Sequence, residues 1–303
     1  MRFFVIALLL LFATTRAASA AETGIAYDAV MVAGIGAARS EPGNFDADFQ
    51  AAQVPFEVPA PGGDMTQVVG RAQEMMSRMA QIGFASRFYA AGARERFDNL
   101  SFGTGTIIDC STRTVMQLNY KTKTYATSSL DDPAHPWPPK PPIPISSMKV
   151  DVQAVGPKLL QNVPTDAYAM SATGTLTAPA LGPTTIAYVM TWYFTKQTVS
   201  FPHCQSGSTD ALALGAGSGL GPGSEIVSIL GAAQSNAYPN VQVTGVALPA
   251  GRIPLFMTMT QQVVTGALPQ MQNVGVSAEF GHIRPISSDD PILSIPADFT
   301  KAP

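Results

Sequence analysis

Hydrophobic and polar residues alternate with a period of two along most of the chain, starting at Phe84. Each alternating segment is short and ends in a polar or glycine-containing turn, which is typical of antiparallel strands joined by hairpins. We therefore expect a mainly β protein with few helices. The first strands of the expected meander are FASRFYAAG, RERFDNLSFG, GTIIDC, RTVMQLN and KTYATSS.

The strand pattern resumes after a proline-rich interruption and is clearest in TTIAYVMTWYFTK. In that segment Ile186, Tyr188, Met190, Trp192 and Phe194 fall on one face, and the residues between them fall on the other. The remaining expected strands are MKVDVQAV, AYAMSATGTLTA, VQVTGVALPAG, RIPLFMTMTQQVV, VGVSAEFGHIRPIS and the terminal PILSIPADF.

A helical period replaces the alternation over residues 65–82. Asp64 is a suitable N-cap residue, and apolar side chains recur every three to four residues after it. A second, shorter helix is expected over about residues 224–234, following a glycine-rich passage. The apolar stripe of the first helix consists of Val68, Ala72, Met75, Met79 and Ile82.

The ends and interruptions of the pattern predict the domain organisation. Residues 1–20 read as a signal peptide, with basic Arg2, the apolar run FFVIALLLLF and a small-residue cleavage site at 18–20. The protein is then exported, to the periplasm or the extracellular space, without a transmembrane segment. Residues 21–63 show weak periodicity and are expected to be an irregular N-terminal extension. Residues 64–303 are expected to form a single β domain with a proline-rich insertion at 131–145.

The composition and charge of the chain indicate which classes of binding partner to expect. The formal net charge is −3 at pH 7, and only 13% of the residues are charged. No basic stripe is present, so we expect no binding to nucleic acid. The 26 glycines and 25 prolines suit many short strands and turns.

Two cysteines, Cys110 and Cys204, are the whole cysteine content of the chain. In an oxidising compartment an even count favours one disulfide between them. Paired free thiols or metal ligands are the alternatives.

Catalytic and metal-binding patterns are weak. The chain lacks a G-x-S-x-G motif, and its histidines are His135, His203 and His282. A Ser–His–Asp arrangement can be drawn through His282 and Asp289 or Asp290, against the simpler interpretation of a surface or strand-end histidine. No spacing is typical of a zinc or calcium site. We expect no cofactor, no metal and no enzymatic activity.

Methionine and aromatic residues are concentrated on the expected strand and helix faces. Packing in the core is the simplest fate for any one of them, but methionine also suits a cavity that accommodates variable apolar ligands. The residues that we expect to line such a cavity are Met75, Met79, Met116, Leu118, Tyr188, Met190, Trp192, Phe194 and Met257.

The segments RFYAAGARERFDN, GTIIDCSTRTVMQLNYKTKTY and PILSIPADF resemble the LolA/LolB-type superfamily of lipoprotein carriers, in particular its poorly characterised exported branch. The resemblance implies an unclosed, strongly curved antiparallel β-barrel covered by helices, here at 64–82 and 224–234. It also implies a non-enzymatic protein that holds a hydrophobic or lipidated ligand in a concave cavity. The alternative is an envelope structural or protein-interaction module that contacts an envelope protein through the proline-rich segment.

Overall fold

A computed structural model describes residues 23–36, 38–56, 65–132, 145–178, 182–198, 241–249, 251–265 and 272–302. The expected signal peptide, most of the proline-rich insertion and the expected helix at 224–234 lie outside these residues. The same holds for Cys204, His135 and His203.

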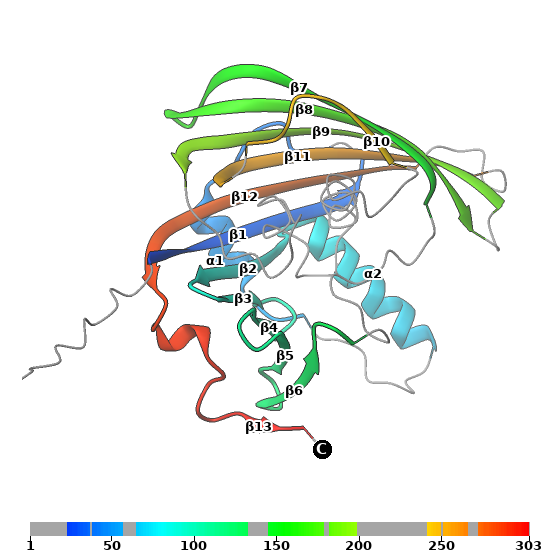
Figure 1. Ribbon diagram of the computed structural model, residues 1–303. Helices are drawn as coiled ribbons and strands as arrows, with labels where there is room; N and C mark the ends of the chain where they lie inside the picture. The colour runs from blue at the N-terminus through cyan, green and yellow to red at the C-terminus, as the bar shows by residue number, and fades with distance from the viewer. Residues whose placement is uncertain are drawn as a thin grey trace, which may run out of the picture.

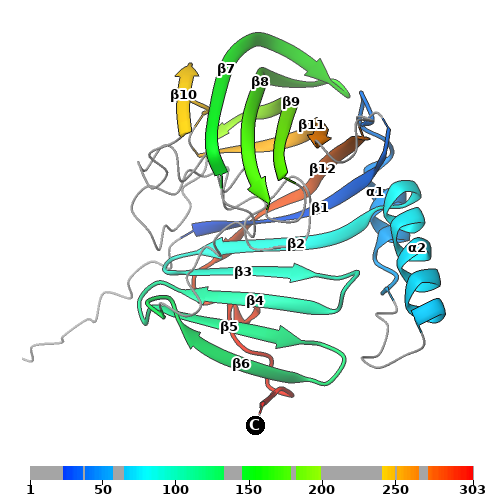
Figure 2. The same cartoon turned by 90° about the vertical axis from the view of Figure 1, so that its right-hand side faces the viewer.

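The described strands form one unclosed sheet of thirteen strands, which curves strongly from β7 around to β6 (Figures 1 and 2). The order across the sheet is β10-β7-β8-β9-β11-β12-β1-β2-β3-β4-β5-β6-β13. All neighbours are antiparallel except β10 with β7 and β13 with β6, which are parallel. The mainly β prediction is therefore confirmed.

The expected meander is present as five short strands, and those of the other half of the sheet are longer. The meander consists of β2 (Phe84–Ala91), β3 (Arg94–Asn99), β4 (Thr104–Asp109), β5 (Thr114–Asn119) and β6 (Thr124–Ser129). The longer strands are β7 (Ile145–Leu160), β8 (Val163–Ala178), β9 (Gly182–Thr198), β11 (Arg252–Thr265) and β12 (Gln272–Ser287), with the short β10 (Val241–Gly245) beside β7.

Two turns of the meander share one local design. Asp109 Oδ1 accepts hydrogen bonds from the backbone N–H groups of Ser111 and Thr112, at 2.9 and 3.2 Å. Asn119 Oδ1 does the same for the two residues at equivalent positions of the next turn, at 3.0 and 3.1 Å. Such Asx turns reverse the chain locally, because the side chain satisfies donors that the ladder leaves unpaired.

The expectation of an irregular segment at 21–63 is wrong. Strand β1 (Thr23–Ile35) lies between β12 and β2 in the middle of the sheet. Both of its faces are covered, so buried residues such as Ala26, Tyr27 and Val30 follow one another closely. A strand buried on both sides shows no alternation of apolar and polar residues, which is why its pattern looked irregular.

A short helix, α1 (Phe45–Ala52), follows β1 and was also unexpected. Asn44 caps it, since its Oδ1 accepts a hydrogen bond from Ala47 N at 3.2 Å. Phe49 and Ala52 of α1 pack with Val30 of β1 and Ala85 of β2. By strand alternation these two sheet residues belong to one face, which we call the outer face.

The predicted helix at 65–82 is confirmed as α2 (Met65–Gln81). It approaches the sheet near the end of β1, because a Cβ atom added at Gly34 would lie 2.7 Å from Ala80 Cβ. Gly83, with φ +86°, makes the sharp turn from α2 into β2. Among the described residues, no helix is long and apolar enough to span a bilayer.

The terminal PILSIPADF segment is not the strand that we expected. It contains a 3₁₀ helix, η2 (Pro291–Leu293), whose first turn is capped by Asp290 Oδ1 accepting from Ile292 N at 2.9 Å. Prolines at 291 and 296 have no N–H to donate to a ladder, which disfavours a strand here. Only the following residues pair, as the two-residue β13 (Thr300–Lys301) beside β6.

Candidate functional site

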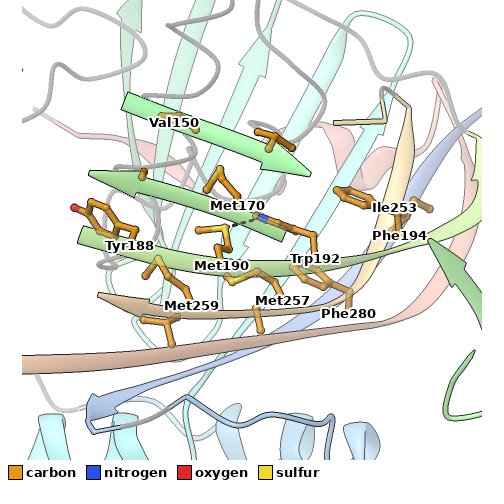
Figure 3. Close-up of a cluster of buried hydrophobic side chains, with 14 of the residues drawn as sticks. Val150, Met170, Tyr188, Met190, Trp192, Phe194, Ile253, Met257, Met259 and Phe280 are labelled. Carbon is orange, nitrogen blue, oxygen red and sulfur yellow. Dashed lines mark hydrogen bonds between the residues drawn. The ribbon is translucent and has the colours of Figure 1, made fainter. Parts of the chain in front are cut away.

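One buried apolar cluster covers the face of the sheet opposite α1, which we call the inner face (Figure 3). It receives side chains from seven consecutive strands in the order β7, β8, β9, β11, β12, β1 and β2. Its largest members are Tyr27, Phe88, Met148, Met170, Tyr188, Met190, Trp192, Phe194, Ile253, Met257, Met259 and Phe280.

Period-two alternation positions these side chains. On β9, Met190 is 1% exposed, whereas the adjacent Val189 is 63% exposed on the other face. The rings of Trp192 and Phe194 stack with their centroids 5.7 Å apart, and the indole Nε1 donates to the Met190 sulfur at 2.6 Å. Aromatic rings and thioethers thus make up most of the centre of this face (Figure 3).

The cluster is covered in this structure. Its members are at most 7% exposed. Among the described residues outside the strands, Met79 of α2 and Leu248 after β10 pack against it. An apolar ligand would reach these side chains only after a cover has moved.

The structure brings together six of the nine residues predicted to line a cavity. Tyr188, Met190, Trp192, Phe194 and Met257 belong to the cluster, and Met79 packs against it. Met75 is partly buried on α2. Whether any of these residues contacts a ligand stays a prediction.

Met116 and Leu118 of β5 lie on the outer face instead. Met116 pairs with Ile107, which pairs with Arg96, which pairs with Tyr89 of the outer face. The same strand register places Leu118 with Asp98. The alternation correctly put both residues on one face, but it could not tell which face the bend of the sheet encloses.

Two polar groups on the inner face were not predicted. Tyr27 is 2% exposed, and its hydroxyl has no hydrogen-bond partner in the described part of the chain. Glu95 of β3 pairs with Ala90, a member of the inner cluster, so its carboxyl belongs to the same face. No described residue forms a hydrogen bond or an ion pair with it. Tyr27 lay in the unrecognised β1, and nothing in RERFDN distinguished Glu95 from the other charged residues of the segment.

Burial shifts the protonation of both groups. It raises the pKa of Glu95 from 4.5 to about 7, with no compensating partner. It also raises the pKa of Tyr27 well above 10, and the nearby charge of Glu95 raises the Tyr27 pKa further. The inner face therefore carries an acid that titrates near neutrality beside a hydroxyl that stays protonated.

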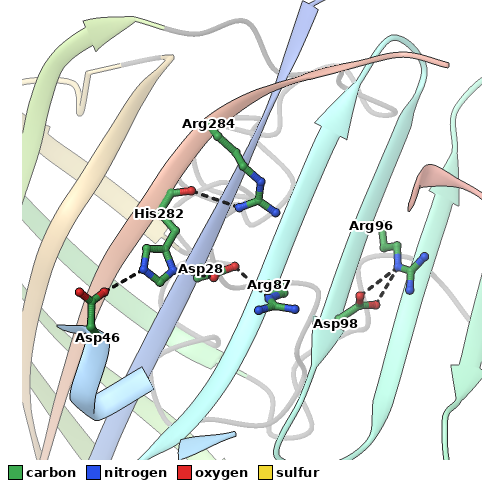
Figure 4. A network of polar contacts seen from close by, with 7 residues as sticks. All are labelled: Asp28, Asp46, Arg87, Arg96, Asp98, His282 and Arg284. Atoms are coloured by element: carbon green, nitrogen blue, oxygen red, sulfur yellow. Dashed lines mark hydrogen bonds and ion pairs between the residues drawn. The ribbon is translucent and has the colours of Figure 1, made fainter. Parts of the chain in front are cut away.

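The outer face holds the histidine that we considered for catalysis (Figure 4). His282 Nδ1 lies 2.9 Å from Asp28 Oδ2, and Nε2 lies 2.8 Å from Asp46 Oδ1. Phe45 and Phe49 of α1 contact the imidazole edge-on, with centroids 5.1 and 5.7 Å away. Both ring nitrogens thus face carboxylates, and no serine hydroxyl bonds to the ring within the described chain. Because its two ring nitrogens bond to Asp28 and Asp46, His282 is partnered by neither Asp289 nor Asp290, and the arrangement drawn through them is wrong.

A second buried polar group joins the meander to the C-terminal segment. Arg96 Nε donates to both carboxylate oxygens of Asp98, at 2.9 and 3.0 Å, and both side chains are nearly inaccessible (Figure 4). The guanidinium also donates to the carbonyl of Ile292 at 2.6 Å and to the hydroxyl of Tyr120 at 2.6 Å. Each nitrogen of the Arg96 guanidinium has a hydrogen-bond partner. We therefore assign the Arg96–Asp98 pair a structural role.

The described residues include one of the two cysteines and most of the acidic side chains of the chain. Within the described ranges, no group of three or more histidine, cysteine or acidic side chains could hold a metal ion. Cys110 follows β4, and its N–H donates to Ala93 O at 2.8 Å. Its expected partner Cys204 lies outside the described residues, so the Cys110–Cys204 disulfide stays a prediction.

The described fold defines a class: a mainly β protein built on one curved, unclosed sheet with an apolar inner face. Comparison of the chain with models of protein families and with curated protein sequences finds no match. The function must therefore be inferred from the site.

Proposed function

We propose that the chain is an exported, non-enzymatic binding protein that holds a hydrophobic or lipid-like ligand against the inner face. The observation that carries the proposal is the single methionine- and aromatic-rich cluster shared by seven strands of a curved sheet. Methionine adapts its shape to different apolar partners. Large concave apolar surfaces with a few polar groups are typical ligand sites.

The fold supports a resemblance to the LolA/LolB-type carriers in its sheet. A curved, unclosed antiparallel sheet is what that superfamily implies. In the proposal α2 serves as the cover, because Met79 packs on the cluster. Gly83, with φ +86°, marks the turn at which the helix meets β2. Ligand would replace the covering side chains rather than enter an open pocket.

Fluorescence of Trp192 provides the test. The chain has two tryptophans, Trp137 and Trp192, so Trp137→Phe leaves a single reporter in the centre of the cluster. Bromine atoms quench tryptophan only at close range, and we expect 1-bromododecane to quench Trp192 in a saturable manner. Lipid extraction of the purified protein, followed by mass spectrometry, should release an apolar ligand. Absence of both signals would refute the proposal.

A protein-interaction role is the second candidate, favoured by exposed apolar side chains around the β7–β8 hairpin. Val155, Leu159 and Val163 are 50%, 74% and 43% exposed, and clustered apolar exposure is typical of contact surfaces. A Leu159→Ser variant should lose envelope partners in a crosslinking experiment while Trp192 quenching stays unchanged. The reverse result would favour the ligand-binding role alone.

A further inference from the structure

We propose that Tyr27 and Glu95 form a polar anchor for the head group of the bound ligand, at one end of the apolar inner face. The inference rests on the proposed binding function and specifies the ligand: an amphiphile with an uncharged or cationic head that donates hydrogen bonds. An amine is the best fit and an alcohol the next. A fatty acid anion is excluded by charge.

The strand register places the two groups together. Tyr27 of β1 pairs with Phe88 of β2, which pairs with Phe97 of β3. Glu95 lies two residues from Phe97 and therefore on the same face. One strand, β2, separates the two residues on this face, and in the proposal both side chains reach the same ligand group.

Tyr27 connects this anchor to the apolar cluster. Its ring stacks on Phe88 with centroids 5.0 Å apart and meets Phe280 edge-on at 6.0 Å. An alkyl chain lying along the methionines of β9 and β11 would thus continue across these rings. Its head would then come next to the Tyr27 hydroxyl and the Glu95 carboxyl.

Within the described chain, the missing hydrogen-bond partners of Tyr27 and Glu95 indicate which kind of ligand head would bind to them. A buried hydroxyl without a partner and a largely buried carboxyl without a cation are both unfavourable in a protein interior. From β1, β2 and β4, the strands that surround β3 on this face, the only other described ionisable side chain is Tyr27 itself. The other charged residues of β1–β4, such as Arg87 of β2 and Asp98 of β3, project to the outer face. An alcohol head can donate to the carboxyl and accept from the hydroxyl, and an ammonium head, which has no acceptor, can donate both to the carboxylate and to the Tyr27 oxygen.

The Glu95 carboxylate also determines which ligand head group should bind most tightly. An ammonium group would pair with the Glu95 carboxylate through a charge-assisted hydrogen bond, which is the strongest kind available. An alcohol can donate to the carboxyl but brings no charge. A carboxylate head would place a second negative charge beside Glu95 in a poorly solvated site.

Competition against 1-bromododecane tests the inference on the full chain carrying Trp137→Phe. Dodecylamine and dodecanoate are added below their micelle concentrations, and dodecanol below its solubility limit, all at pH 8; recovery of Trp192 fluorescence reports displacement. We expect the amine to bind most tightly and dodecanoate most weakly. Glu95→Gln should weaken amine binding about tenfold, and Tyr27→Phe should weaken binding of the alcohol and the amine.

The matched control is Glu74→Gln, which makes the same change of charge on the exposed surface of α2 and should leave all three affinities unchanged. Circular dichroism verifies that each variant is folded. If Glu95→Gln and Tyr27→Phe bind all heads as the parent does, the anchor is refuted while the binding function stands. If 1-bromododecane never quenches Trp192, both proposals fail.

Discussion

His282 Nδ1 lies 2.9 Å from Asp28 Oδ2, and this contact joins the two central strands β12 and β1 across the outer face. Asp46 of α1 holds the other ring nitrogen. The hydrogen bond with Asp28, followed by that with Asp46, raises the pKa of His282 above 6.5. The histidine therefore fixes α1 to the sheet most firmly when it is protonated.

Stability should respond to this histidine in a defined pH window. Because the pKa is raised in the folded state, the stabilisation is complete below pH 6.5 and is lost as pH rises through the folded-state pKa. The side chain is 45% exposed, so we expect less than about 1 kcal/mol. NMR titration should show a pKa above 6.5 that falls in Asp46→Asn. A His282 pKa at or below 6.5 in the parent protein would contradict the prediction.

Glu95 should produce the same direction of pH dependence in a different window. Its pKa is raised from 4.5 to about 7, so the unfolded chain releases this proton first and stability falls as pH rises from 4.5 to about 7. The full shift corresponds to about 3 kcal/mol. Urea unfolding at several pH values should show the fall in the parent, and a much flatter profile in Glu95→Gln. Glu74→Gln should retain the fall.

Removal of the Tyr27 hydroxyl should stabilise the ligand-free protein. The buried oxygen has no partner among the described residues, so Tyr27→Phe avoids its desolvation and keeps the ring contacts with Phe88. We expect the free energy of unfolding to rise by about 1 kcal/mol. Addition of dodecylamine should reverse the order, with the parent protein more stable than the Tyr27→Phe variant in the presence of the ligand. A destabilised Tyr27→Phe variant without ligand would mean that the hydroxyl is satisfied.

Arg96 should be among the most sensitive positions for folding. Arg96→Met would leave Asp98 buried without its cation and would remove the link to Ile292, so we expect a loss of about 3–5 kcal/mol. Asp98→Asn in the same chain should recover part of that loss, because the uncompensated charge is gone. Urea denaturation of the single and double variants measures both. Ligand binding to Trp192 should change little if the variants remain folded.

A substitution at Gly34, near the end of β1, should displace α2, the proposed cover of the inner face. In Gly34→Val the new Cβ would lie 2.7 Å from Ala80 Cβ, a separation that forces α2 away from the sheet. We expect a loss of about 1–3 kcal/mol together with faster quenching of Trp192 by 1-bromododecane. Ala80→Gly removes the conflicting methyl group, so the double variant should return toward the parent. Equal quenching rates in all three proteins would show that α2 is not the cover.

Much of the strand pattern could be predicted because alternation survives wherever one face is buried more deeply than the other. The five short meander strands and α2 follow directly from such periods. Strand β1 could not be recognised, since burial of Ala26, Tyr27 and Val30 on both faces removes the alternation. The C-terminal strand was overestimated because prolines at 291 and 296 cannot join a ladder.

The candidate site was predicted in part for the same reason. Alternation put Tyr188, Met190, Trp192 and Phe194 together, and the structure does the same. Alternation says nothing of which way a sheet bends, so Met116 and Leu118 were grouped with them although they lie on the outer face. The polar pair Tyr27 and Glu95 depends on long-range strand order, which no local pattern contains.

The two short parallel pairings, β10 beside β7 and β13 beside β6, have a consequence for the protein in concentrated solution. An open sheet ends in backbone N–H and C=O groups that can recruit strands of other molecules. Among the described residues, β7 is paired at this margin only by Val241–Gly245, and β6 only by Thr300–Lys301. Within the described part of the chain, two of the shortest strands therefore cover the margins of the sheet, and loss of Thr300–Lys301 would expose the backbone of β6 to strands of other molecules.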